Sequence, residues 1–189
     1  MDMSRTTRFA AATTAALALT LIIVACDSPS GPDHNSLAAR ESVQKADFQR
    51  QVAEIKAATA RYNNVANARA DGYVDDGFGC IQDPQLGGMG WHLIRDDLHA
   101  DPTIDPLQPE LLVYMPQKNG QMKLVALEYE VYQADWINAG FTGVPFILDQ
   151  PFLPLEYPGL DPVYERHVWL WENNPAGMFE DYNPAIACP

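Results

Sequence analysis

Serine and basic residues are scarce in most of this chain of 189 residues. No serine occurs after Ser42, so all later residues lack the nucleophile that a serine hydrolase needs. Only four Lys and Arg residues lie beyond position 70, against 19 Asp and Glu residues, and the formal net charge of the chain is −13. A surface that binds nucleic acid needs basic side chains to neutralise phosphates. We therefore exclude a nucleic-acid partner, and the handling of phosphate substrates is disfavoured.

Several catalytic signatures are also missing. The sequence has no G-x-S-x-G, no H-E-x-x-H, no P-loop, and no G-x-G-x-x-G that a helix follows. It has three cysteines but no C-x-x-C pair, which argues against a zinc knuckle and against a dithiol redox motif. No local signature therefore identifies a reaction.

The first 26 residues have the pattern of an export signal. Arg5 and Arg8 precede Ala10–Ala25, an uncharged run that is shorter than the ~20 residues needed to span a bilayer. Its end, Ile23-Val24-Ala25-Cys26, resembles the bacterial lipobox. The resemblance implies removal of a signal peptide over 1–25, acylation of Cys26, and a lipid anchor that holds the protein to a membrane of the bacterial cell envelope, facing the periplasm or the exterior. An uncleaved membrane anchor and an ordinary signal peptide are the alternatives.

The mature chain is expected to consist of a tether and one domain. Residues 26–36 form the lipidated cysteine and a flexible tether, because their Pro, Gly, Ser, Asp and Asn residues leave nothing to bury. Residues 37–189 form a single domain. Lipidation of Cys26 leaves Cys80 and Cys188, and two remaining thiols tend to pair in an oxidising compartment. We therefore predict a Cys80–Cys188 disulfide; free thiols and metal-ligating thiols are the alternatives.

One long helix is predicted over 37–70, a stretch without Pro or Gly. Asn35 or Ser36 would cap its start and Gly72 would stop it. Its apolar stripe can dock on a sheet or on another helix, and we favour a sheet because the region from 71 to 189 has the pattern of short strands. The stripe consists of Phe48, Val52, Ile55, Thr59, Tyr62 and Ala66.

Four strands are predicted, at 91–95, 110–115, 122–132 and 163–171. The best of them, 122–132, alternates between an apolar face with Val125, Leu127, Tyr129 and Val131 and a second face with Ala126, Glu128 and Glu130. Asn119-Gly120 predicts a turn that joins it to 110–115 as a hairpin. The expected fold class is α+β: one long N-terminal amphipathic helix packed on a small, mainly antiparallel sheet or half-barrel with long Pro- and Gly-rich loops, at 96–109 and 141–162.

Two histidines in predicted strands are the best candidates for a functional site. If the strand faces that carry His92 and His167 meet the Glu128 face, two imidazoles and a carboxylate converge. This is a usual ligand set for one divalent metal ion (zinc, iron or manganese), with open positions for water or substrate. Glu130 or Glu165 would then orient the imidazoles. The alternatives are hydrogen-bonded core histidines and glutamates on the solvated side of an edge hairpin.

Tryptophans and acidic segments allow two further interpretations. Trp91, Trp169 and Trp171 would wall a groove for a small-molecule or glycan ligand, or they would belong to the core. The acidic segments 71–77 and 96–105, expected as loops, would bind calcium or simply form an acidic surface, and neither matches an EF-hand.

The stretches GMGWH, PELLVY, LVALEYEV and HVWLWENNPAGMF are similar to an uncharacterised family of secreted bacterial proteins with MGxH and HVWLWxxNPxGxF motifs. The resemblance covers residues 60–188. It implies that His92, Glu128, His167 and the Cys80/Cys188 pair lie at recurring positions of that family, and it implies no activity. Two functions stay open: a lipid-anchored protein that binds a divalent metal or small ligand at its His/Glu site, or a non-catalytic envelope protein that binds a glycan or protein partner.

Overall fold

The computed structural model describes residues 34–189. The predicted signal peptide, Cys26 and the tether up to residue 33 lie outside the described residues. The first helix, α1 (His34–Thr59), begins inside the predicted tether, so the expectation that residues 34–36 belong to a flexible segment is wrong. In the part of the chain that the structure describes, no helix combines the length and the apolar character needed to cross a bilayer.

The long predicted helix is divided into three pieces. α1 passes into a 3-10 turn, η1 (Ala60–Asn63), and a short helix, α2 (Val65–Ala70), follows. Asn64 between them is extended (φ −97°, ψ 107°), and its side chain accepts a hydrogen bond from the Ala66 amide. The prediction of one continuous helix over 37–70 is therefore wrong at this point, because Asn64 caps a new helix instead of continuing the old one. The break also changes the helical phase, so that Ala68 is buried in place of the predicted Ala66.

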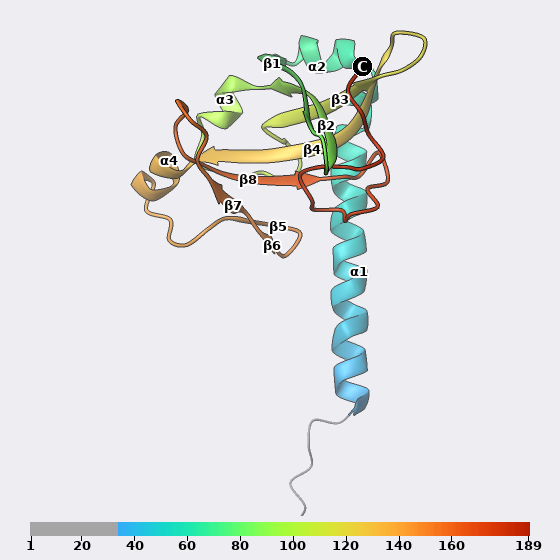
Figure 1. The fold of residues 1–189 in the computed structure, drawn as a ribbon. Coiled ribbons are helices and arrows are strands. Elements are labelled where there is room, and N and C mark those ends of the chain that lie inside the picture. The colour runs from blue at the N-terminus through green and yellow to red at the C-terminus, as the bar shows by residue number, and fades with distance from the viewer. Residues whose placement is uncertain (1–33) are drawn as a thin grey trace, which may run out of the picture.

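Six antiparallel strands form one sheet that curls into a half-barrel, as predicted (Figure 1). A separate hairpin of β5 (Phe146–Ile147) and β6 (Gln150–Pro151) lies in the segment expected as a loop, and the short helices α3 (Asp96–His99) and α4 (Gln133–Asn138) lie in other connections. In their order across the sheet the strands are β1 (Val74–Asp83), β2 (Gly87–Ile94), β3 (Leu111–Pro116), β4 (Met122–Tyr132), β8 (Val163–Val168) and β7 (Leu153–Leu155).

The central hairpin agrees best with its prediction. β4 has the predicted bounds, and the turn that joins it to β3 is closed by the Gly120 amide, which donates to the Gln117 carbonyl at 2.8 Å. Alternation along β4 is interrupted at Val125, where the register with β3 shifts. The prediction that Val125 shares a face with Leu127 is therefore wrong, and Val125 packs in a second apolar cluster. β8 ends three residues before the predicted Trp171, whose amide leaves the ladder and donates to the Val125 carbonyl.

β1 is the longest of the strands that the sequence patterns miss; the others, β5, β6 and β7, lie in the segment 141–162 that was expected as a loop. Residues 74–77 of the expected acidic loop belong to β1, so that the loop prediction for this segment is wrong. Gly77 and Gly79 both have positive φ, and the pairing with β2 is irregular between Asp75 and Cys80. Such bulged pairing interrupts the two-residue alternation by which a strand is recognised.

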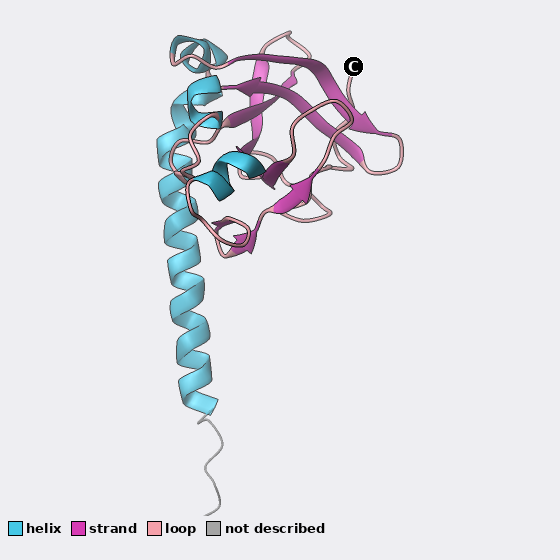
Figure 2. Ribbon diagram, turned by 90° about the vertical axis from the view of Figure 1, so that its left-hand side faces the viewer, coloured by secondary structure: helices cyan, strands magenta, loops and turns pink. Residues whose placement is uncertain are grey.

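The main core lies between the sheet and the C-terminal part of α1 (Figure 2). Ile55, Thr59 and Tyr62 of the predicted stripe are buried, whereas residues 36–47 of α1 are exposed. The helix thus docks on the sheet, as expected, but only over its second half. The Tyr114 hydroxyl of β3 ties the end of η1 to the sheet by donating to the Tyr62 carbonyl at 2.6 Å.

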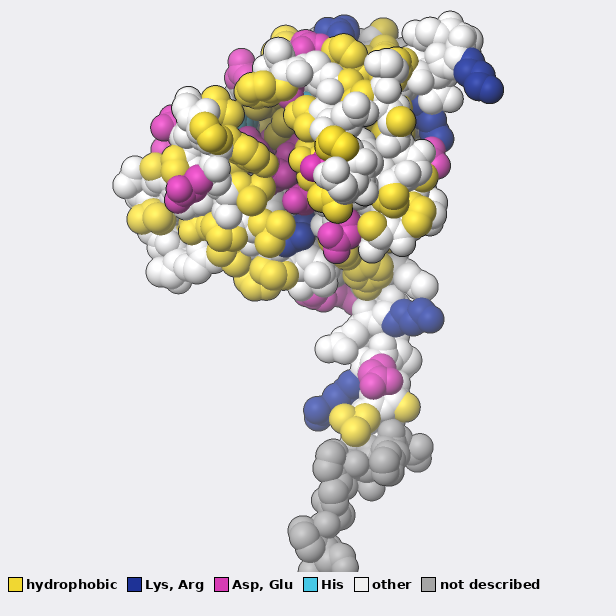
Figure 3. All heavy atoms as spheres, in the orientation of Figure 1, with side chains coloured by type: hydrophobic (Ala, Val, Ile, Leu, Met, Phe, Trp, Pro, Cys, Tyr) yellow, Lys and Arg dark blue, Asp and Glu magenta, His cyan; other side chains and the backbone are white. Residues whose placement is uncertain are grey.

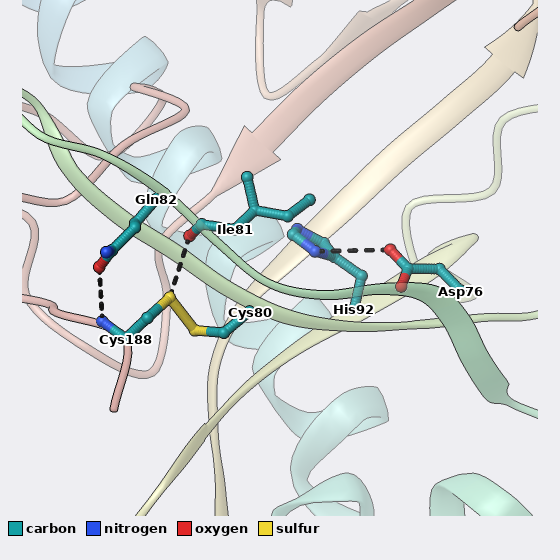
Figure 4. Close-up of a disulfide and its surroundings, with 6 residues drawn as sticks. All are labelled: Asp76, Cys80, Ile81, Gln82, His92 and Cys188. Carbon is teal, nitrogen blue, oxygen red and sulfur yellow. Dashed lines mark hydrogen bonds and ion pairs between the residues drawn. A yellow bond between two sulfur atoms is a disulfide. The ribbon is translucent and has the colours of Figure 1, made fainter. Parts of the chain in front are cut away.

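The C-terminal tail is fixed to the β1–β2 hairpin. The predicted Cys80–Cys188 disulfide is present, with a Cα–Cα distance of 5.8 Å, and the Cys188 amide donates to the Gln82 side chain (Figure 4). The tail also approaches β2 so closely that a Cβ atom on Gly87 would lie 2.2 Å from the Asn183 carbonyl oxygen. The disulfide and this close approach hold the last residues against the sheet edge.

Candidate metal centre

Three strands bring the predicted ligands together on the face of the sheet opposite α1. Glu128 of β4 lies directly opposite His167 of β8 in the strand pairing. His92 of β2 is paired with Val113 of β3, so that one strand separates it from β4. Neighbours such as Leu93 and Leu127 point into the core on the other face, because side chains alternate along a strand. The curl of the sheet then closes the gap between the outer two ligands.

The three ligand atoms form a nearly equilateral triangle. The Nε2 atoms of His92 and His167 are 3.4 Å apart. The Glu128 Oε2 atom lies 3.3 Å from Nε2 of His92 and 3.5 Å from Nε2 of His167. In a tetrahedral zinc site with bonds of about 2.0–2.1 Å, two ligand atoms are separated by about 3.3–3.4 Å. The triangle therefore has the dimensions of one face of a zinc coordination tetrahedron.

All three side chains are withdrawn from solvent. The exposed fractions of the His92, Glu128 and His167 side chains are 3%, 5% and 0%. The Glu128 Oε2 atom and both Nδ1 atoms have no hydrogen-bond partner among the described residues. A buried polar atom without a partner destabilises a fold by about 1–3 kcal/mol. A cation at the centre of the triangle would satisfy the carboxylate oxygen and both ring Nε2 atoms at once.

A carboxylate stands behind each imidazole. His167 Nδ1 lies 3.2 Å from Oε1 of Glu165 and 3.8 Å from Oδ1 of Asp181. His92 Nδ1 lies 3.8 Å from Oδ2 of Asp76 (Figure 4). With Nε2 directed into the triangle, each Nδ1 faces a carboxylate, which is the side from which an acceptor orients a metal-binding histidine. Glu165 thus lies where the sequence analysis expects it, and Asp76 and Asp181 were missed because they belong to a bulged strand and to the tail.

Burial controls the charge of these groups. Burial, with a smaller contribution from His167, lowers the pKa of His92 to about 3, so that His92 is the neutral imidazole that a metal requires. Burial, reinforced by Glu165, raises the pKa of Glu128 well above its usual range. Burial also opposes the ionisation of Glu165, but the neighbouring His167, Glu128 and Tyr157 together outweigh it and lower the Glu165 pKa. A cation beside Glu128 would offset the unfavourable burial of its charge.

Glu130 has a partner that no sequence pattern indicates. Its Oε1 atom lies 2.6 Å from Nε2 of His99, a buried side chain of α3. The His99 ring packs against Tyr132 with a centroid distance of 4.2 Å. The expectation that Glu130 orients one of the predicted histidine ligands is therefore wrong, because Glu130 binds His99 instead. His99 lies in an acidic segment without strand alternation, so no sequence signal pointed to it.

A cavity of ≈970 Å³ adjoins the triangle and extends across the sheet face. Figure 3 shows the acidic side chains in the hollow of this face, with hydrophobic side chains on both sides of it. Among its lining residues are the carboxylates Asp76, Asp96, Glu128, Glu130, Asp161 and Glu165. The aromatic lining residues are Phe78, Tyr132, Tyr157 and Tyr182.

The predicted tryptophan groove does not form. Trp169 is buried in the second apolar cluster, where its indole N–H donates to the Glu180 carbonyl at 2.6 Å. Trp171 packs against the main core, and Lys56 lies over its ring at 5.1 Å. Trp91 lies under Gly79 of β1. None of the three lines the cavity, because β8 ends before Trp171 and Trp91 points to the opposite face from its neighbour His92.

The acidic segments 71–77 and 96–105 do not assemble a calcium site in the described residues. Among the described residues, none of the groups of side chains that could hold a metal contains a residue of either segment. Asp71 pairs with Arg61, and Asp97 with Arg95. The Asp101 and Asp105 carboxylates accept hydrogen bonds from backbone amides two residues further on, so they stabilise turns.

No protein-family model, curated protein or solved structure matches this chain in the comparisons. The resemblance to secreted bacterial proteins therefore stays a prediction.

Proposed function

We propose that this chain is a lipid-anchored protein of the bacterial cell envelope whose domain binds one divalent metal ion through His92, Glu128 and His167. The observation that carries the proposal is the buried triangle of ligand atoms with edges of 3.3–3.5 Å. The lipobox at Cys26 supports the anchor. The Cys80–Cys188 disulfide is consistent with an oxidising compartment.

The dimensions of the triangle favour zinc over iron and manganese. Adjacent ligands in an octahedral site with bonds of about 2.1 Å lie about 3.0 Å apart, which is shorter than all three edges. Two imidazoles and one carboxylate also form a common catalytic zinc set, in which the fourth position holds water or substrate. Zinc bound in this way lowers the pKa of its water to about 7 and polarises carbonyl groups, so the site would support hydrolysis.

Metal analysis of the purified full chain in detergent tests the zinc site. After equilibration with zinc and removal of the free metal, the wild type should retain one equivalent per chain. His92→Ala and His167→Ala each remove a ligand and should weaken zinc binding at least ~100-fold. Cobalt in place of zinc should give the intense visible absorption of a four-coordinate site.

The matched control is His34→Ala, which removes a histidine at the start of α1 and should retain the full equivalent of zinc. Circular dichroism verifies that each variant is folded. A folded wild type without bound zinc, or ligand variants that bind zinc as the wild type does, would overturn the proposed site.

A further inference from the structure

The cavity beside the metal triangle is unusually acidic. Six carboxylates line it, while no Lys or Arg is among its lining residues. The nearby strand β8 carries Arg166, but this guanidinium donates to the carbonyls of Pro151 and Phe179 and is engaged there. Within the described residues, no Lys or Arg of the wall therefore neutralises the negative charge of the cavity, and among its carboxylates Glu130 pairs with the His99 imidazole.

A zinc ion would neutralise only part of this charge. Glu128 would be a ligand, and Asp76 and Glu165 stand behind the imidazoles. Three more carboxylates, which we call the outer carboxylates, remain: Asp96, Glu130 and Asp161. Burial raises the pKa of the lining residue Tyr132, and the charges of these three groups and of Asp135 raise it further.

Two buried carboxylate oxygens of the cavity wall have no hydrogen-bond donor among the described residues. Oε1 of Glu165 and Oε2 of Glu128 belong to lining side chains that are 2% and 5% exposed, and neither oxygen accepts a hydrogen bond in the described residues. The other oxygen of Glu165 accepts from the Tyr157 hydroxyl at 3.0 Å. A carboxylate oxygen without a donor attracts a positively charged group.

Aromatic walls favour an organic cation over a simple ion. Tyr132 and Tyr157 line the cavity together with the outer carboxylates, and Phe78 and Tyr182 line it as well. The face of an aromatic ring attracts ammonium and guanidinium groups, and its apolar surface packs against their carbon chains. A volume of ≈970 Å³ accommodates such a molecule in addition to the metal triangle.

We propose that the outer carboxylates and tyrosines bind an organic cation, an ammonium or guanidinium group on an apolar body, in a ligand whose other end reaches the metal triangle. Contact of the ligand's other end with the metal triangle rests on the proposed function, whereas binding of the cation does not require the metal. The site thereby selects cationic ligands and rejects anionic ones of the same shape.

Calorimetric titration of the full chain in detergent, with and without zinc, tests this selection. The probe is benzyltrimethylammonium, which has no lone pair and cannot ligate zinc. Benzyltrimethylammonium should bind the zinc-loaded and the zinc-free protein at least ~10-fold more tightly than the neutral benzyl alcohol does. Phenylacetate, an anion, should not bind the zinc-free protein. A capped Gly-Arg-Gly peptide in parallel shows whether a guanidinium on a peptide is preferred to the free cation.

Substitutions locate the site. The double variant Asp96→Asn/Asp161→Asn should weaken binding of the probe about 10-fold, because it removes two outer carboxylates at the exposed rim. The control is Glu156→Gln, which removes one charge from an exposed side chain outside the cavity lining and should change the affinity less than about 2-fold.

Equal affinity for the charged and neutral probes, or equal effects of the rim and control variants, would overturn the inference. The two proposals fail separately. Zinc binding without binding of the probe rejects the organic cation alone, and binding of the probe to a chain that holds no zinc rejects the metal centre alone.

Discussion

At the scale of single residues, the site is built from histidines whose two ring nitrogens have different surroundings. In His167, Nε2 faces Glu128 and His92, while Nδ1 faces Glu165 at 3.2 Å. These surroundings favour the tautomer that leaves Nε2 free to bind a metal ion. Because the fold already holds the ligands at tetrahedral spacing, little conformational entropy would be lost on binding.

Glu110, a buried carboxyl outside the cavity lining, gives stability a pH dependence of its own. The side chain is 1% exposed, and its Oε2 atom accepts a hydrogen bond from the Glu130 amide at 3.2 Å. Burial raises the pKa of Glu110 from its ordinary value of 4.5 to about 8. The folded state therefore holds this proton more tightly than the unfolded state does. The resulting stabilisation is complete below about pH 4.5 and is lost as the pH rises through about 8.

Replacing Glu110 by Gln, an uncharged side chain of the same shape, should remove this dependence. We expect the free energy of unfolding of Glu110→Gln, relative to the wild type, to rise by about 2–4 kcal/mol between pH 5 and pH 9. Urea denaturation of both proteins at the two pH values, with a chelator present, measures it. A difference that does not change with pH would contradict the buried ionisable carboxyl.

At the scale of secondary-structure elements, α1 has two unlike halves. Its C-terminal half packs on the sheet through Ile55 and Thr59, and its N-terminal half from Ser36 to Asp47 is exposed and extends beyond the domain (Figure 1). Ion pairs of Arg50 with Asp47 and Glu54 lie on the exposed face. Such surface pairs contribute little to stability, so packing of the second half holds the helix in place.

Truncating one apolar residue in each half should separate their roles. Ile55→Ala removes a side chain that is 1% exposed and should lower the free energy of unfolding by about 2–4 kcal/mol. Val43→Ala, at 68% exposure on the same helix, should change it by less than about 0.5 kcal/mol. Urea denaturation compares the two. Equal losses would mean that the first half of α1 also packs against something.

At the scale of the whole molecule, charge and covalent links are unevenly distributed. The region from 71 to 189 contains 19 acidic and four basic residues, whereas residues 26–70 contain five acidic and six basic ones. The disulfide closes a segment with a sequence separation of 108, and restriction of the unfolded chain by such a loop stabilises the fold by about 3–5 kcal/mol. An acidic domain would be repelled by an anionic bilayer, which fits a domain that an N-terminal anchor holds away from the lipid.

The proposed anchor predicts a change of location on one substitution. Cys26→Ser removes the lipid acceptor, so the protein should lose incorporated palmitate and leave the membrane fraction of the expressing bacterium. Labelling with palmitate and fractionation measure both effects, and Ser42→Ala in α1 serves as a control that should keep the label. Membrane association and labelling that persist in Cys26→Ser would reject the anchor.

Local patterns predicted the elements whose signal lies in neighbouring residues. β4 and its Asn119-Gly120 turn have the expected bounds, because alternation and turn chemistry act within a few residues. The disulfide was predictable because few cysteines were left to pair. The break at Asn64 was missed, because competition between capping and helix continuation is decided by packing on both sides.

The sequence by itself determined the α+β class, the central hairpin and the pairing of Cys80 with Cys188, since each depends on residue type and local spacing. It also marked His92, Glu128 and His167 as candidates. Only the tertiary structure decided that their ligand atoms form a triangle of 3.3–3.5 Å, that Asp76 and Asp181 stand behind them, and that the tryptophans lie elsewhere. These relations depend on the curl of the sheet, on bulges and on the path of the tail, and contacts between residues far apart in the chain leave no periodic signal in it.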